Sequence, residues 1–356
     1  MQIDASDADD NQQRRPRLTP AIADVRRAVR GSFAEVPDGG LVLVGLSGGA
    51  DSLALAAATA FEAPRAGIRA GAVIVDHQLQ PGSADVAARA AEHASALGLA
   101  PVVIHAVVVH RGDHGAAGSG PEADARDARY AAFDQALADT SAVGILLAHT
   151  LDDQAETVLL GLARGSGPTS LRGMSPVTGP YLRPLLGIRR STTRQACTDA
   201  GLEYWDDPQN LDPAYARVRV RTVVLPTLEA ELGPGIAEAL ARTAEQLRED
   251  NDALDDMILE TIEDICEPAE AGIAVSVGAL TANPPALRHR IIRFVVQSEF
   301  GIALERVHVE AVARLVTDWH GQKPLDLPGV RVARQSGMLV FTNTAAARND
   351  TPDDTI

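Results

Sequence analysis

Four short runs of residues that are apolar throughout constrain the fold of this chain more than any other feature of its sequence. The stretches between them have a helical pattern. Apolar strands that alternate with helices indicate a parallel sheet covered on both faces, a doubly wound α/β domain. Ligands bind beyond the carboxyl ends of the strands in such domains, so we expect the informative residues to follow the strands. The predicted strands cover residues 41–46, 71–75, 101–109 and 143–148, and the predicted helices cover 50–60, 84–97, 122–138 and 152–164.

The pattern changes after Pro226, where longer helical stretches replace the alternation of strands and helices. A chain of 356 residues is long enough for about two domains. Helical patterns over 236–265, 285–300 and 304–319 precede a short β-like end at 330–341. We therefore predict a first domain over 18–232, a smaller and mainly helical domain over 233–344, and disordered tails at 1–17 and 345–356.

Composition excludes several classes of protein. No apolar run approaches the ~18 residues that a membrane-spanning helix needs. The polar segment 1–17 lacks the apolar stretch of a secretory signal. Cys197 and Cys266 are the 2 cysteines, too few for a disulfide framework or a four-thiolate zinc site. We therefore expect a cytoplasmic protein.

The charge is distributed unevenly along the chain. A formal net charge of −16 argues against nucleic acid, because a protein that binds phosphates usually has a basic surface. Three segments nevertheless contain arginines and no acidic residue. They are either basic surface for a polyanion or ordinary solvated arginines whose stems pack on helices. The arginines are 164, 172, 183, 189, 190 and 194 in the first segment, 217, 219 and 221 in the second, and 288, 290 and 293 in the third.

The segment Leu46–Ser52 reads LSGGADS and lies between the first predicted strand and the first predicted helix. Glycines allow close approach of a ligand to the backbone, and the N–H groups of a helix start suit phosphate. The segment has no lysine and fits neither a Walker A loop nor a G-x-G-x-x-G motif. Asp51 would repel a bare phosphate, but a divalent cation such as Mg²⁺ could bridge the two. The alternative is an incidental turn with a Ser/Asp helix cap.

The motif SGGxDS after a first strand resembles the signature of the PP-loop ATP pyrophosphatases. The resemblance implies an adenine nucleotide α-hydrolase-like fold and cleavage of ATP between its α and β phosphates. It also implies that Asp51 holds Mg²⁺. The residues expected to bind ATP are Ser47, Gly48, Gly49, Ala50, Asp51, Ser52, Asp76 and His77.

Charged residues also follow two other predicted strands and open the helix between them. Asp76 and His77 follow the second strand, and Arg126 and Arg129 share one face of helix 122–138. The segment 149–157 reads HTLDDQAET and follows the fourth strand. Acidic residues at a helix start also have a structural reading, because they interact favourably with the helix dipole. Since the strand ends of a parallel sheet converge, we expect these groups to surround one ligand.

Together these motifs resemble the tRNA(Ile)-lysidine synthase family over residues 41–226. The family pattern continues with RGSG at 164–167, RPL at 183–185, and DPQN at 207–210 followed by YARVRVR at 215–221. Two positions depart from it: Gln80 stands where an arginine is usual, and Val218 where an asparagine is usual. Each departure removes a polar contact.

The resemblance implies that a wobble cytidine in a CAU-anticodon tRNA-Ile is adenylated by ATP and then attacked by L-lysine, which releases AMP and yields lysidine. Asp51, Asp153, Glu156 and Arg126 are the expected catalytic and lysine-binding residues. The helical domain would bind the tRNA or support the first domain. The arginines expected to contact tRNA are Arg129, Arg183, Arg189, Arg190, Arg217, Arg219 and Arg221.

Three other functions fit parts of the sequence. A tRNA thiolase of the same superfamily often has CxxC pairs, which this chain lacks. PP-loop synthetases and amidotransferases lack the segments that follow Thr157. A non-catalytic ATP-binding module would gain little from carboxylates beside the phosphates.

Overall fold

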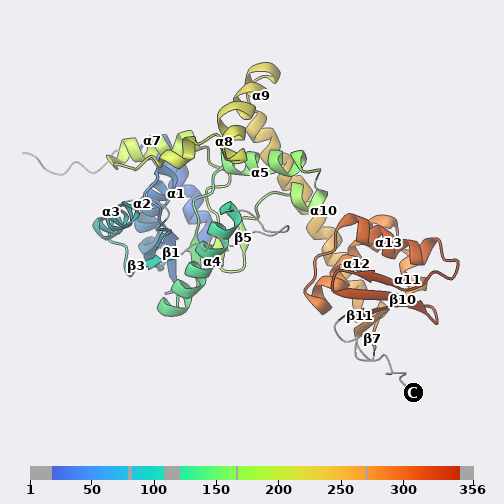
Figure 1. Ribbon diagram of the computed structural model, residues 1–356. Coiled ribbons are helices and arrows are strands. Elements are labelled where there is room, and N and C mark those ends of the chain that lie inside the picture. The colour runs from blue at the N-terminus through green and yellow to red at the C-terminus, as the bar shows by residue number, and fades with distance from the viewer. Residues whose placement is uncertain (1–17, 79–81, 108–120, 166, 270–271, 345–356) are drawn as a thin grey trace, which may run out of the picture. The chain divides into compact units, whose positions relative to one another are not determined.

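The computed structural model describes residues 18–78, 82–107, 121–165, 167–269 and 272–344 (Figure 1). The chain divides into two compact units, Met1–Arg248 and Glu249–Ile356, and each has its own sheet and apolar core. The predicted tails, the departure at Gln80 and Ser166 of the RGSG segment lie outside the described residues.

The first unit is built on a six-stranded sheet with the strand order β3-β2-β1-β4-β6-β5. All neighbours pair in parallel except the two-residue edge strand β5, which is antiparallel to β6. This confirms the predicted doubly wound parallel sheet. The strands are β1 Leu41–Gly45, β2 Arg69–Asp76, β3 Val102–Ala106, β4 Gly144–Leu146, β5 Val177–Thr178 and β6 Tyr181–Leu182.

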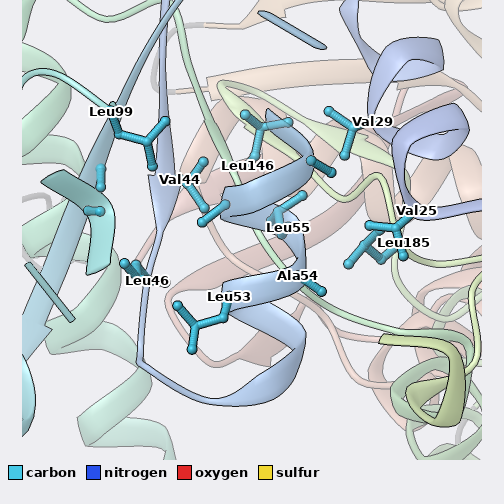
Figure 2. Close-up of a cluster of buried hydrophobic side chains, with 14 of the residues drawn as sticks. Val25, Val29, Val44, Leu46, Leu53, Ala54, Leu55, Leu99, Leu146 and Leu185 are labelled. Carbon is cyan, nitrogen blue, oxygen red and sulfur yellow. The ribbon is translucent and has the colours of Figure 1, made fainter. Parts of the chain in front are cut away.

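Alternating residues of β1 enter two different cores. Val42 and Val44 are fully buried in the core formed with α1, α2, α3 and α7. Leu41 and Leu43 face the other core, which contains residues of α4. Side chains alternate across a strand, so a central strand that is apolar throughout must be covered on both faces. Figure 2 shows the first core, where Leu55 of α2 lies near Val44 and Leu146 of the sheet, and Leu53 lies nearer Leu46.

All four predicted helices of the alternating region form, and two further helices, α1 and α7, complete the core under the sheet. Both begin at a residue that the sequence analysis did not identify as a helix start. Pro at the first position and the Thr19 side chain cap the beginning of α1. The helices are α1 Pro20–Ser32, α2 Ala50–Glu62, α3 Ser83–Ala96, α4 Pro121–Thr140, α5 Leu151–Ala163, α6 Pro168–Leu171, α7 Arg190–Ala200, α8 Ala216–Arg219, α9 Leu225–Leu232 and α10 Ile236–Ile265.

The second unit contains a five-stranded antiparallel sheet with the order β7-β8-β11-β10-β9. The sequence predicted only a short β-like end here, because β7 and β8 are separated from the β10–β11 hairpin by three helices. The hairpin turns at Ser336 and Gly337, which both have positive φ. The elements are β7 Cys266–Ala269, β8 Gly272–Ser276, α11 Val277–Ala282, α12 Pro285–Phe300, α13 Arg306–Thr317, β9 Leu325–Leu327, β10 Val330–Gln335 and β11 Met338–Asn343.

The division between the units falls within α10, after Arg248, whereas the sequence pattern predicted a domain boundary at 232/233. Gly233 and Gly235 lie between α9 and α10. The first half of α10 belongs to the first unit, because Ala237 packs with Leu151 of α5 and Leu225 of α9.

Leu55 provides a test of the first core. It is fully buried, so Leu55→Ala should lower the free energy of unfolding by about 3 kcal/mol through lost burial and a residual cavity. Leu162→Ala, at a side chain that is 51% exposed, is the control and should change it by less than about 0.5 kcal/mol. Urea unfolding followed by tryptophan fluorescence in a Trp319→Phe background lets Trp205 report on the first unit alone. Equal effects of the two substitutions would contradict this core.

Candidate active site

The loop after β1 turns the chain sharply into α2. Gly48 has φ +81°, in the left-handed region that favours glycine. Gly49 is the N-cap residue of α2 and offers no side-chain cap. No side-chain oxygen of the cap residue therefore covers the N–H groups at the helix start, which carry the positive end of the helix dipole. A loop of this geometry can bind a phosphate.

Two serines and a tryptophan hold this loop in place. The Ser52 hydroxyl accepts from the Ser47 backbone N–H at 3.2 Å, lies 3.1 Å from the Ser47 hydroxyl, and donates to the Gly49 carbonyl. The backbone N–H of Trp205 donates to the Gly48 carbonyl at 3.0 Å. Ser52 is buried and Ser47 is exposed, so Ser52 fixes the loop while Ser47 faces outward.

The start of α5 buries two carboxylates beyond the end of β4. Thr150 and Asp153 form a capping box, in which the Asp153 carboxylate accepts from the Thr150 N–H at 2.8 Å and from its hydroxyl at 2.7 Å. Asp153 is 9% exposed and Glu156 is fully buried. Buried carboxylates require charged or hydrogen-bonded partners. The helix cap therefore supplies hydrogen-bond partners for one carboxylate oxygen of Asp153 and for neither oxygen of Glu156.

Two arginines supply the remaining partners. The Arg190 guanidinium contacts Asp153 at 2.7 Å, Glu156 at 3.2 Å and Asp51 at 3.5 Å. The Arg221 guanidinium contacts Glu156 at 2.7 Å and Asp153 at 3.3 Å. The three predicted carboxylates, one from α2 and two from α5, are thus joined through Arg190. We call Asp51, Asp153, Glu156, Arg190 and Arg221 the carboxylate cluster.

The two aspartates of the cluster differ electrostatically. Burial raises the pKa of Asp51 above its usual value, although the Thr193 hydroxyl and the Arg190 charge oppose the shift. Burial also acts to raise the pKa of Asp153, but Arg190 and the hydrogen bonds from Thr150 outweigh it and hold that pKa below its usual value. Asp153 is therefore ionised at neutral pH. An ionised carboxylate in a buried position can bind a cation or accept a proton.

Neighbouring acidic residues anchor the start of α7. The Asp152 carboxylate accepts from the Arg190 backbone N–H at 2.8 Å and from the Arg189 guanidinium at 3.0 Å. Arg189 also donates to both carboxylate oxygens of Glu238, at 2.6 and 2.7 Å. Asp152 thus caps α7 from another helix, which places Arg190 beside the cluster. A pocket of about 190 Å³ opens here, and it is lined by Asp152, Glu156, Arg189, Arg190, Arg221, Leu225, Pro226, Glu229 and Ala237.

The end of β2 has a different chemistry. Asp76 is buried and accepts from the Gln78 N–H, while the Arg129 guanidinium donates to Nε2 of His77 at 3.3 Å. Because arginine only donates, His77 must accept at Nε2 and hold its proton on Nδ1. Burial, and then the Arg129 charge, lower the pKa of His77 to about 4, although Asp76 opposes them. His77 is therefore neutral at pH 7.

The other predicted arginines occupy three kinds of environment. Arg126 and Arg129 are exposed on α4, where Arg126 lies over the Tyr130 ring. Arg183 is buried and donates to the Ser175 carbonyl at 2.9 Å. Arg219 is exposed and donates to the Pro213 and Ala214 carbonyls at 2.6 and 2.8 Å.

The segment 216–224 changes from α8 into a five-residue π-helix, Val220–Val224. Arg221 lies in this π-helix and contacts the carboxylate cluster, and single-turn π-helices are frequent at functional sites. Arg217 is partly buried, and it is close enough to His149 to lower the pKa of that residue. Val218, the departure from the family pattern, is buried and apolar.

Sequence reasoning found the three carboxylates but not the groups that hold them. Arg189, Arg190 and Arg221 were expected to contact RNA, and in this structure they pair with carboxylates. Thr193, whose hydroxyl donates to Asp51, was not identified at all. A threonine on a polar helix gives no sequence signal of such a contact.

The site can be tested for its fit to Mg²⁺. Among the described residues, no group of three or more His, Cys, Asp or Glu side chains could hold a metal ion. Mg²⁺ is commonly bound by one or two carboxylates together with substrate phosphates, so Asp51 beside a phosphate loop fits that ion.

None of the described helices is long and apolar enough to span a membrane.

The partly buried His149 should make stability depend on pH. Burial, with help from the Arg183, Arg126 and Arg217 charges, lowers its pKa to about 4, although Asp153 opposes them. Unfolded histidine titrates near pH ~6.5, so between these values only the unfolded state binds the proton. The contribution of His149 to the free energy of unfolding is thus complete above pH ~6.5 and is lost as the pH falls toward 4. The free energy of unfolding then changes by at most about 1.4 kcal/mol per pH unit.

His149→Gln should flatten this dependence, with part of the slope remaining because His77 titrates in the same way. Urea unfolding at pH 7.5, 6.5 and 5.5 measures it, and His308→Gln in the second unit serves as the control. If the slope does not change in the His149 variant, His149 is not held neutral in the folded state.

Comparison with known proteins accounts for most of the chain. Residues 24–228 match the PP-loop domain family, and residues 276–340 match the TilS substrate binding domain. The tRNA(Ile)-lysidine synthase of Leifsonia xyli subsp. xyli is 66% identical over 304 residues, which cover 85% of this chain and 90% of the relative. The tRNA(Ile)-lysidine synthase of Thermobifida fusca is 50% identical over 326 residues, which cover 91% of this chain and 98% of the relative.

A solved structure shares the fold. The U34-tRNA thiolase NcsA from Methanococcus maripaludis, solved with its [4Fe-4S] cluster, superimposes with a TM-score of 0.53 at 19% identity, over 64% of this chain and 80% of that one. This likeness concerns the fold alone. Both domain families match, and the alignments cover at least 90% of each of these two relatives. The chain therefore belongs to the tRNA(Ile)-lysidine synthase family of PP-loop proteins.

Proposed function

We propose that this chain is an ATP-dependent ligase that joins L-lysine to the wobble cytidine of CAU-anticodon tRNA-Ile, giving lysidine, AMP and pyrophosphate. The observation that carries the proposal is the meeting of a phosphate-type loop after β1 with the buried Asp153 and Glu156 after β4. These strands are neighbours in one parallel sheet, and Arg190 contacts carboxylates from both segments. One site can therefore bind a polyphosphate and a cationic amine side by side.

The ATP end of the site is the loop from Ser47 to Ser52, with Asp76 and His77 beside the nucleotide. Cytidine O2 would attack the α-phosphorus, forming an O–P bond while pyrophosphate leaves. N–H groups at the start of α2 would bind the phosphate oxygens. When bound, Mg²⁺ would neutralise the charge of the phosphates, and Asp51 is the residue that would hold it.

The lysine end is the carboxylate cluster and its pocket. The amine nitrogen would attack C2 of the activated cytidine, forming a C–N bond and breaking the C–O bond to the departing AMP. Asp153 and Glu156 would bind ammonium groups, and one of them would accept the proton that the amine loses. The pocket has side chains of both charges, which suits a free amino acid with a carboxylate and ammonium groups.

The RNA would approach over the arginines. Arg126, Arg129 and Arg219 are exposed, and with Arg217 they could meet phosphates or the activated base. Five arginines already donate to carbonyl or carboxylate groups, so they would contact RNA only by exchanging those partners: Arg183, Arg189, Arg190, Arg219 and Arg221. tRNA and ATP meet in the cytoplasm, where we expect this chain to act.

A tRNA thiolase is the alternative with the most similar fold. The positions of the two cysteines count against it. Cys197 is buried against the Ala50 carbonyl in the first unit, and Cys266 belongs to the second unit. Two such thiols cannot supply the ligands of an iron–sulfur cluster, which is usually held by four.

The first prediction from this function separates the two chemical steps. With ATP, Mg²⁺ and a CAU-anticodon tRNA-Ile transcript, Asp153→Asn should lower incorporation of labelled L-lysine by at least about 100-fold. Pyrophosphate release on addition of tRNA should persist, because Asp153 is proposed to bind the amine and not ATP. Asp127→Asn, at an exposed position of α4, is the control. Equal loss of both steps would assign Asp153 to adenylation, and incorporation into a CAU-anticodon methionine tRNA would contradict the substrate.

A second prediction concerns the second unit, which we propose either binds the tRNA or supports the first unit. Arg293 lies close enough to Arg290 and Arg306 for their charges to lower its pKa, after burial as the main cause. Arg306 is 85% exposed, so Arg306→Glu should leave the fold intact. If this surface contacts the RNA backbone, tRNA affinity should fall in the variant. The slope of log affinity against log salt concentration should also decrease by about one, as expected for the loss of one phosphate contact. Unchanged filter binding at two salt concentrations would favour a purely supporting role.

A further inference from the structure

We propose that Thr193 is a positioning residue that fixes the Asp51 carboxylate in the geometry needed to hold Mg²⁺ beside ATP. The inference rests on the proposed function, in which Asp51 is the magnesium ligand. The observation behind it is the contact of the Thr193 hydroxyl, from the first turn of α7, with Oδ1 of Asp51 at the start of α2.

The two oxygens of Asp51 are held from a single turn of α7. Thr193 donates to Oδ1, and Nε of Arg190 lies 3.5 Å from Oδ2. A carboxylate attached to a helix by one methylene group can rotate, and two partners from one rigid turn restrict that rotation. Arg190 alone would leave the Oδ1 side unrestrained.

The Thr193 hydroxyl has few alternatives. The side chain is fully buried, and a buried hydroxyl needs a hydrogen-bond partner. Its oxygen also lies 2.8 Å from the Arg190 carbonyl, but a helical carbonyl has a regular partner in the N–H four residues later. An ionised carboxylate only accepts, so the single hydroxyl proton stabilises the pair most when it points to Asp51.

A second contact fixes the same face of α7 against the start of α2. Cys197 lies four residues after Thr193, which places both on one side of the helix. Its fully buried thiol donates to the Ala50 carbonyl at 3.2 Å. Consecutive turns of α7 therefore bind consecutive residues of α2, which keeps the hydroxyl of Thr193 opposite Asp51.

The test measures metal binding without catalysis. Mn²⁺, as a probe for Mg²⁺, is titrated into the full chain with ATP and no tRNA, and free Mn²⁺ is followed by electron paramagnetic resonance. Thr193→Val keeps the shape of the side chain and removes the hydroxyl. Its dissociation constant for Mn²⁺ should rise about tenfold, as expected for loss of a hydrogen bond to a charged group. The half-saturating Mg²⁺ concentration for pyrophosphate release should rise in parallel, while the KM for lysine stays within about twofold.

Two variants separate positioning from a merely structural role. Thr193→Ser retains the hydroxyl and should restore Mn²⁺ binding. Thr198→Val removes an exposed hydroxyl from the same helix, one that donates to the Arg194 carbonyl, and should behave as the unmodified chain. Thermal unfolding of each variant checks the fold.

Several results would overturn the inference. One is unchanged Mn²⁺ affinity in Thr193→Val, whether or not turnover falls. Another is loss of Mn²⁺ binding in Thr193→Ser equal to that in the valine variant. If the unmodified chain binds no Mn²⁺ with ATP and releases no pyrophosphate with tRNA, the proposed function fails together with this inference.

Discussion

The ion pairs of Arg190 determine how the catalytic unit brings its acidic groups together. Three carboxylates within reach of one another repel, and burial raises the cost of charging each of them. The Arg190 guanidinium lies among all three, and Arg221 contacts two of them. Such buried pairs contribute little net stability, but removal of one partner leaves an uncompensated charge. The arginines are therefore a condition for assembling this site.

The parallel sheet supplies the second condition. Strands β1 and β4 are neighbours, and the chain enters α2 after β1 and α5 after β4. The chain between them provides β2 and α3, whose alanines pack closely against the first core. Because both faces of β1 are buried, the position at which the loop leaves the strand after Gly45 is fixed by packing. The phosphate-type loop and the carboxylate cluster thus depend on the packing of the strand interior.

Much of this fold could be predicted from the sequence, because apolar strands and intervening helices leave a local pattern. Ala50–Glu62 and Leu151–Ala163 were predicted within two residues at each end. Helix α7 was missed, because its sequence RSTTRQACTDA is polar and its start is capped by Asp152 from a distant segment. The sheet of the second unit was incompletely predicted, since its strands pair across about sixty residues.

The same distinction applies to the site. The carboxylates at 51, 153 and 156 stand in motifs, so a sequence can reveal them. The partners of Arg189, Arg190 and Arg221 depend on tertiary contacts, and a run of arginines without acidic residues looks the same whether it faces solvent or a buried acid. Charge patterning along a chain describes composition, whereas ion pairing depends on which segments the fold brings together.

The cations of the site have one further consequence. All of them are guanidinium groups, which stay protonated and lack a nucleophilic lone pair at any physiological pH. Lys323 is the only lysine of the chain and belongs to the second unit. A carbon activated for attack by an amine, as proposed here, would therefore meet no ε-amino group from the first unit itself. The first unit would thus provide positive charge beside the proposed intermediate without providing an amine that competes with the substrate.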